Sequence, residues 1–238
     1  MPEKYRPHFW VVGAVLSLFL AWVIYTPIPF TALKVAAVAS ALLLFVGVGL
    51  AFKPGKWLCL GVSIPLLLCA LWPASKPDSS QLRAHYLAAL VAYQGTPYVW
   101  GGENGRGLDC SGLMRRAMID ALISQGWHDH NPALWREATS VWWHDCSASA
   151  MKSGYNGYIE PLFPAKNLNA LDTTRLRGGD LAITQSGVHV LAFVGGKTWI
   201  QADPNLANGG DKVIQTTAPT KNGWFTQRVQ ICRWKNLS

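Results

Sequence analysis

Residues 95–102 read Gly-Thr-Pro-Tyr-Val-Trp-Gly-Gly, and residues 109–112 read Asp-Cys-Ser-Gly. The run that follows, Leu113–Ile123, is helical in composition, so Cys110 is expected at or just before a helix N-terminus. Free backbone N–H groups and the positive end of the helix dipole favour a thiolate there, which predicts a nucleophile near neutral pH. The same N–H groups can receive the oxyanion of an acyl-transfer intermediate. A lone cysteine more often packs as a small apolar residue, but the neighbouring glycines let a substrate approach the backbone closely.

A cysteine nucleophile needs a base, and His189 is the preferred candidate. It lies in residues 187–194, whose β-branched and aromatic content predicts a strand, after a turn and strand at residues 176–183. A core histidine satisfied by the backbone is the alternative reading. The other histidines after Cys110 lie in an irregular, tryptophan-rich stretch, residues 126–152.

The returning strand of a hairpin is expected at Thr198–Asp203, after a turn at residues 195–197. Gln201 and Asp203 share one face of that strand because side chains alternate. Either residue could orient the base. An amide can accept the imidazole N–H but carries no charge, so Gln201 would stabilise an imidazolium less than a carboxylate would.

Gly95–Gly102 together with Asp109–Leu113 resembles the signature of the NlpC-type cysteine peptidases, bacterial cell-wall hydrolases with a papain-like core. The likeness extends more loosely over residues 81–203. It implies an α+β domain with helices packed on an antiparallel sheet, and it strengthens His189 as the base. A polar residue, often histidine, orients the base in that family, and Gln201 departs from this pattern.

The resemblance also implies substrate-binding residues beside the nucleophile. In the family, the matching residues hold the amine end of a peptidoglycan stem peptide, which makes Tyr98, Asp109 and Ser111 candidates here. The structural alternatives are equally plain. Tyr98 can be a core residue, and Asp109 can be a helix N-cap.

The front of the chain, residues 9–72, carries hardly a charge and reads as an all-α membrane anchor. It contains three apolar runs, each near the lower limit of about 17 to 25 residues for a membrane-spanning helix. A signal peptide fits less well, because no small-residue cleavage pattern closes the first run. The runs cover residues 9–25, 35–52 and 57–72, with gaps at 27–29 and 53–56.

Basic residues precede the first run and fill the second gap, whereas the first gap has Lys34 at its edge. By the positive-inside tendency, the N-terminus and the second gap are cytoplasmic. Three crossings would then export everything after Trp72. Pro65 interrupts the short third run, and two crossings, the alternative, would reverse the side of the catalytic domain. The cytoplasmic markers are Lys4, Arg6, Lys53 and Lys56.

These patterns divide the 238 residues into an anchor at 1–73, a linker at 74–80 and a hydrolase domain at 81–238. The formal charge of +8 is scattered, without a basic block or an aromatic-basic ladder, which argues against nucleic acid as a partner. The partners expected are peptidoglycan stem peptides and the lipid bilayer. The sequence identifies no protein partner.

The stretch between Cys110 and His189 is longer than a compact core requires and could form a lid or groove wall, or a satellite hydrophobic cluster. Its histidines and Cys146 fit no common structural zinc spacing, so no metal is expected, and the preferred chemistry needs no cofactor. A disulfide between Cys146 and Cys232 would suit an oxidising compartment. The histidines in question are His128, His130 and His144.

The sequence therefore predicts a cysteine peptidase on the periplasmic side of the bacterial inner membrane that cuts an amide bond in peptidoglycan stem peptides. Which bond is cut, and whether it belongs to the cell's own wall or a competitor's, stays open. The alternatives are an acyltransferase or lipid hydrolase of related fold, and a catalytically weak wall-binding membrane module.

Overall fold

The computed structural model describes residues 6–52, 54–73 and 75–238, so Lys4, Lys53 and Ala74 lie outside the described residues. Three apolar helices come first: α1 (Arg6–Tyr25), α2 (Thr31–Ala51) and α3 (Gly55–Leu71). Among the described helices, α2 alone is both long and apolar enough to cross a membrane; the apolar part of α1, Phe9–Tyr25, and the whole of α3 are shorter. Three crossings therefore stay a prediction.

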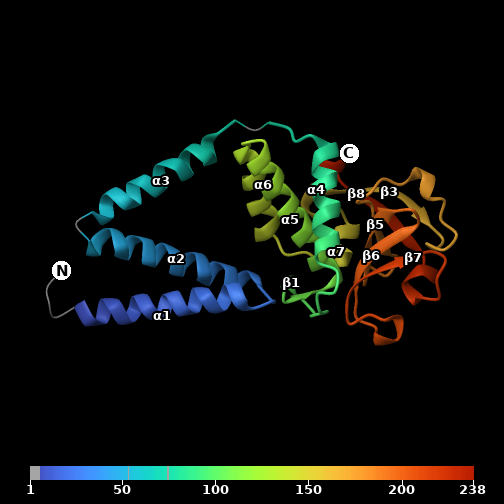
Figure 1. Cartoon of the computed structure of the whole chain (residues 1–238), viewed down its shortest axis with the longest axis horizontal. Helices are drawn as coiled ribbons and strands as arrows, with labels where there is room; N and C mark the ends of the chain where they lie inside the picture. Colours follow the sequence, from blue (N-terminus) through green and yellow to red (C-terminus); the bar gives the residue numbers. More distant parts are fainter. Residues whose placement is uncertain (1–5, 53, 74) are drawn as a thin grey trace.

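The first two helices form an antiparallel pair, and α3 diverges from them before the chain enters the second half of the molecule (Figure 1). Apolar side chains surround all three helices rather than forming one stripe, and most of these side chains are exposed. Such helices are typical of a segment whose surroundings are themselves apolar.

The second half begins with a helical layer. Asp78 caps α4 (Ser79–Ala92) by accepting hydrogen bonds from the backbone of Ser80 and Gln81. A short hairpin, β1 (Glu103–Asn104) and β2 (Gly107–Leu108), leads into α5 (Cys110–His128). The helices α6 (Pro132–Trp143) and α7 (Ala148–Lys152) follow, and α4 and α6 both pack on α5.

A six-stranded antiparallel sheet completes the domain, in the order β3-β8-β4-β5-β6-β7. The helical layer lies on one side of it (Figure 1). The α+β class expected from the sequence, helices packed on an antiparallel sheet, is confirmed. The strands are β3 (Ile159–Ala165), β4 (Leu181–Thr184), β5 (Val190–Gly195), β6 (Thr198–Asp203), β7 (Lys212–Thr217) and β8 (Val229–Trp234).

The core positions the site because α5 packs against β5 and β6. Leu113, Met114 and Ala117 of α5 are fully buried in one cluster with Val190 and Ile200 of the sheet. A second cluster, built around Trp199 and Phe225, covers the opposite face of the sheet. With both faces packed, the first turn of α5 is held firmly over the adjoining ends of β5 and β6.

Candidate active site

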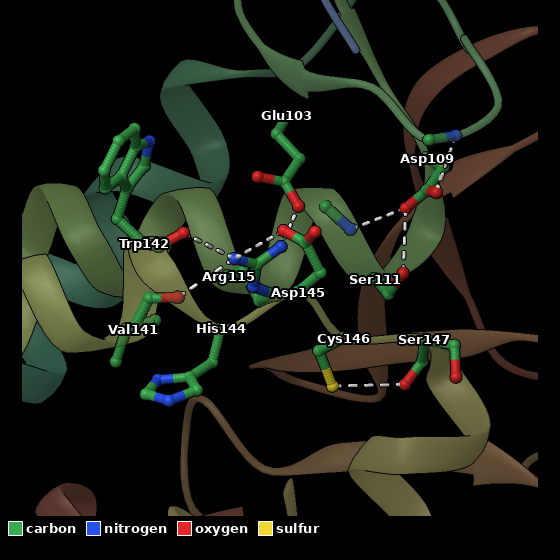
Figure 2. Close-up of polar contacts among 12 residues, drawn as sticks. Glu103, Asp109, Ser111, Arg115, Val141, Trp142, His144, Asp145, Cys146 and Ser147 are labelled. Atoms are coloured by element: carbon green, nitrogen blue, oxygen red, sulfur yellow. Dashed lines mark hydrogen bonds and ion pairs between the residues drawn. The ribbon is translucent and has the colours of Figure 1, made fainter. Parts of the chain in front are cut away.

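Cys110 is the first residue of α5, as expected. Asp109 caps the helix, and its carboxylate accepts from the backbone N–H of Gly112 at 2.6 Å, from that of Gly101 at 2.9 Å and from the Ser111 hydroxyl at 2.9 Å (Figure 2). This cap fixes the first turn, where the backbone N–H groups of a helix have no partner within the helix. The cysteine sulfur therefore lies beside backbone N–H groups that could receive an oxyanion.

Cys110 and His189 line one cavity of about 840 Å³. The sulfur lies 3.9 Å from the carbonyl oxygen of Val188, the residue immediately before His189. His189 itself precedes β5 rather than lying within it, and its backbone pairs with Thr184 at the end of β4. The structure thus brings together two side chains that are 79 positions apart.

The thiol of Cys110 is 7% exposed, and this burial, with the negative charge of Asp109, raises its pKa to about 12. The expectation that the helix end would produce a thiolate near neutral pH is therefore wrong for this state of the site. Backbone hydrogen bonds act in the opposite direction but are outweighed, because an anion loses its hydration when the sulfur is enclosed. A pKa raised this far keeps the Cys110 thiol neutral near pH 7.

A chain of polar contacts fixes the orientation of the His189 ring. Nε2 of His189 lies 2.7 Å from Oε1 of Gln201, and Nε2 of Gln201 lies 3.4 Å from Oδ2 of Asp203. A carboxylate can only accept, so the Gln201 amide turns its NH2 group toward Asp203 and its oxygen toward the imidazole. The imidazole must then donate from Nε2, which leaves the lone pair on Nδ1 available as a base.

The imidazole is enclosed as well as oriented. His189 is 1% exposed and stacks on the ring of Trp224, with centroids 4.1 Å apart and planes inclined by 15°. Burial lowers the pKa of His189 to about 4, although the hydrogen bond to Gln201 and the charge of Asp203 favour the imidazolium. The imidazole of His189 is therefore neutral near pH 7, like the Cys110 thiol.

Asp203, the alternative partner for the base, does not contact the imidazole directly. Its carboxylate instead accepts hydrogen bonds from the surrounding loops and from β6, and the side chain is completely buried. This hub ties the segments after β6 and β7 to the strand that carries Gln201. The donors are the backbone N–H of Asn205, Nε1 of Trp224, and the side-chain amides of Gln201, Asn208 and Asn222.

All three substrate-binding candidates line the cavity: Tyr98, Asp109 and Ser111. Their structural readings hold too, since Asp109 is the N-cap of α5 and Tyr98 packs against the main core cluster. Burial and the nearby charge of Asp109 raise the pKa of Tyr98, so its hydroxyl remains a donor. A carboxylate has about four acceptor sites, so Asp109 keeps room for a further donor beside its three internal hydrogen bonds.

The long segment between Cys110 and β4 contributes to two separate hollows. Its residues Asp145–Ala148 form part of the wall of the cavity that contains Cys110. Its tryptophans do not line that cavity. Trp127, Trp135 and Trp142 line a separate hollow of about 380 Å³ between α5 and α6.

The three histidines between Cys110 and His189 do not line the cavity and lie at or just beyond the ends of α5 and α6: His128, His130 and His144. Within the described ranges, no three His, Cys, Asp or Glu side chains gather as metal ligands would. Cys146 and Cys232 are both free thiols, Cys146 in the cavity wall and Cys232 buried in β8.

A buried ionic cluster lies next to the cavity. Arg115 of α5 pairs with Glu103 and lies 4.0 Å from Asp145, and its guanidinium also donates to the carbonyls of Val141 and Trp142 (Figure 2). Glu103 and Asp145 both line the cavity. The cluster therefore joins the wall of the cavity to the helix that carries Cys110.

Sequence reasoning missed two contributors to the site. Trp224 stacks on the His189 ring from the segment between β7 and β8, and no local pattern marks it. Ile28 and Phe30 line the cavity from the connection between α1 and α2, which the sequence assigned to the anchor alone. Both arrive through tertiary contacts between distant parts of the chain, which periodicity does not register.

Comparison with known proteins identifies the fold. The sequence model of the NlpC/P60 family matches residues 95–233, more than half of the chain. No curated protein matches it.

Solved structures with similar folds include the peptidoglycan hydrolase RipB from Mycobacterium tuberculosis, 19% identical over 82% of this chain and 83% of that chain, with a TM-score of 0.40. The P60 domain of an antigen from Mycobacterium avium paratuberculosis is 17% identical over 66% of this chain and 95% of that chain, with a TM-score of 0.40. An NlpC/P60 family protein from Bacillus cereus is 16% identical over 67% of this chain and 41% of that chain, with a TM-score of 0.41. On the strength of the family match, and as its Asp-Cys-Ser-Gly motif predicted, the chain belongs to the NlpC/P60 family.

Proposed function

We propose that the chain is a membrane-anchored cysteine peptidase that hydrolyses an amide bond in peptidoglycan stem peptides. The observation that carries the proposal is the shared cavity, which is lined both by Cys110 at the start of α5 and by His189, whose ring is oriented by Gln201. Membership of the NlpC/P60 family, which includes peptidoglycan hydrolases, supports the substrate class.

In the proposed reaction, Nδ1 of His189 takes the proton of the Cys110 thiol as the sulfur attacks the amide carbonyl. The resting pair is neutral, so charge separates only when substrate has displaced water and the carbonyl oxygen begins to carry charge. Backbone N–H groups at the start of α5 receive that oxyanion. The imidazolium then protonates the leaving amine, and water, deprotonated by His189, releases the acyl group from the sulfur.

The carboxylate beside Cys110 supports a substrate with a free amine. Glu103 and Asp145 line the same cavity but are paired with Arg115 and Lys34, whereas among the described residues no cation pairs with Asp109. A stem peptide carries an amine near the bonds that such enzymes cut. We assign Asp109 to that amine, with Tyr98 and Ser111 as neutral hydrogen-bonding partners.

The contacts of the three apolar helices support an anchor with the catalytic domain on one side. The α1–α2 connection touches the domain through Pro27 and Thr26, and the end of α3 touches it through Arg136 of α6, which donates to the carbonyl of Trp72 at 2.9 Å. The start of α1 and the α2–α3 connection lie at the far end (Figure 1). Three crossings would place the domain opposite the N-terminus, on the periplasmic side.

Mass spectrometry of isolated peptidoglycan incubated with the full chain in detergent tests the activity. We expect new muropeptides from the wild type, none from Cys110→Ala, and the wild-type products from Cys146→Ala, which removes the other thiol of the cavity. Intact peptidoglycan with the wild type would refute the peptidase. Release of acyl chains from lipid would favour the related acyltransferase or lipid hydrolase, and retention on the polymer without cleavage would favour a wall-binding module.

A further inference from the structure

The connection between α1 and α2, residues 26–30, is built into the catalytic cavity. Its backbone carbonyls act as acceptors for the β1–β2 hairpin: Asn104 donates from its side chain to Thr26 at 2.7 Å, and the backbone N–H of Glu103 donates to Pro27 at 2.8 Å. The hairpin directly precedes Cys110, so the connection is fixed to the segment that presents the nucleophile.

A second set of contacts fixes the connection from the side of α2. The Thr31 hydroxyl donates to Asp145 at 2.6 Å, and the Lys34 ammonium pairs with Asp145 and donates to the carbonyl of Trp142 at 2.8 Å. Lys34 is 1% exposed, although it belongs to an otherwise apolar helix. A charge is buried at such a position only with partners, so this contact is specific to the catalytic domain.

Between these two attachments, the connection turns apolar side chains toward the cavity. Ile28, Pro29 and Phe30 line it, together with Trp100. Ile28 also approaches Gly101 so closely that a Cβ added there would meet its Cγ2 at 3.4 Å, and the N–H of Gly101 holds the Asp109 cap. Gly101 therefore links the two features, because it lies beside Ile28 of the apolar wall and donates to Asp109, the N-cap of α5.

This wall is left exposed in a cavity whose lining also includes the apolar side chains of Val188, Pro204 and Trp224. Ile28 is 43% exposed and Phe30 is 56% exposed, although the chain on either side of them is attached to the catalytic domain through Pro27 and Thr31. Apolar side chains held rigidly at a cavity gain free energy when an apolar group displaces water from them. Because the cavity is continuous from Phe30 to Cys110, that group belongs to the molecule whose amide lies at the sulfur.

We propose that residues 28–30 form an apolar subsite of the catalytic cavity, which binds an aliphatic or aromatic group of the substrate beside the scissile amide. This assignment rests on the proposed function, since it names a part of the substrate that the peptidase would take. It also gives the α1–α2 connection a role in recognition besides that of joining two helices. The group can come from a peptide side chain or from a lipid carrier, which share this chemistry.

The test uses the full chain in lipid nanodiscs and two thiol reagents of one chemistry, N-methylmaleimide and N-benzylmaleimide. The rate of Cys110 modification is read by mass spectrometry of the peptide that contains it, so hydrolysis is not required. We expect the ratio of the benzyl rate to the methyl rate to be about ten-fold larger at Cys110 than at a small free thiol in solution. Phe30→Ala and Ile28→Ala should remove most of that advantage.

Phe52→Ala is the matched control, because Phe52 is a partly exposed phenylalanine at the opposite end of α2. It should leave the ratio of the two rates unchanged. If Phe30→Ala accelerates both reagents equally, the connection is a steric cover and the subsite is refuted. If neither Phe30→Ala nor Ile28→Ala changes the rates or their ratio, the subsite is also refuted, and these side chains are bilayer contacts. Muropeptides with and without a polyprenyl carrier then distinguish the two sources, through a KM that rises in Phe30→Ala for the source that is used.

Failure of the proposed function has a different signature. In that case the wild type leaves every muropeptide intact while the maleimide ratio still reports the apolar wall. The two ideas are therefore separable in one set of samples.

Discussion

Nε2 of His189 donates to Oε1 of Gln201 across 2.7 Å, within a site where both side chains are almost completely buried. The oxygen of the amide faces the ring because its NH2 group faces Asp203. An uncharged residue thereby selects the tautomer of the base. In the proposed mechanism, Gln201 would contribute by selecting the tautomer rather than by stabilising the imidazolium with a charge.

Replacing Gln201 by leucine should therefore lower kcat on muropeptides by about 10² with little change in KM. Leucine keeps the volume but accepts no hydrogen bond, so the ring is free to place its proton on Nδ1. Steady-state kinetics measure both parameters. Gln215→Leu, on exposed β7, is the control and should keep the wild-type rate; equal rates in the two variants would remove Gln201 from the mechanism.

Asp203→Asn should destabilise the domain by about 2 to 4 kcal/mol, because it removes the buried charge on which five donors converge. Asparagine can satisfy at most part of this set, and its own NH2 group would face other donors. Thermal unfolding followed by circular dichroism reports the change. Asp211→Asn serves as the control, since Asp211 is exposed and its φ of 60° suits asparagine. A loss of equal size in both variants would show that the hub carries no special stability.

The thiol should titrate at high pH. With its pKa at about 12, Cys110 should be alkylated by iodoacetamide about ten-fold faster for each pH unit between 7 and 9, without a plateau. Asp109→Asn keeps an N-cap side chain but removes the charge, so the pKa should fall and alkylation at pH 8 should accelerate.

Mass spectrometry of the Cys110 peptide supplies these rates. Asp78→Asn alters an equivalent cap on α4, far from the sulfur, and should leave them unchanged. A plateau below pH 8 in the wild type would contradict the raised pKa.

Stability should fall as the pH drops from 6.5 toward 4. Burial lowers the pKa of His189 from 6.5 to about 4, so between these pH values the imidazole is protonated in the unfolded chain but neutral in the folded chain. Linkage then removes about 3 kcal/mol of stability over that window, and the contribution is fully present above 6.5.

His189→Asn should weaken this pH dependence, since asparagine does not titrate. The comparison uses the difference in unfolding temperature between pH 7 and pH 4.5 within each variant, which cancels the effect of lost stacking on Trp224. The exposed His128→Asn is the control. Identical pH dependence in wild type and His189→Asn would show that this histidine does not titrate as described.

Much of this molecule could be predicted from local sequence. The three apolar runs correspond to α1, α2 and α3, the returning strand Thr198–Asp203 is β6, and Cys110 begins α5. Each of these rests on composition or period, which local residues determine. The charge state of Cys110 could not be predicted this way, because it depends on burial by segments far away in the chain. The same holds for Trp224 and for Lys34, whose partners come from α6 and the loop after it.

The two attachments between the apolar helices and the NlpC/P60 domain would limit where the proposed peptidase can work. Arg136 grips the end of α3 at the carbonyls of Cys69 and Trp72, while Lys34 and Thr31 hold the start of α2. With α2 embedded in a bilayer, these contacts would hold the domain close to the membrane surface. The proposed peptidase would then act only on the layer of the wall next to the membrane, where newly made strands are added, and would not reach the outer layers.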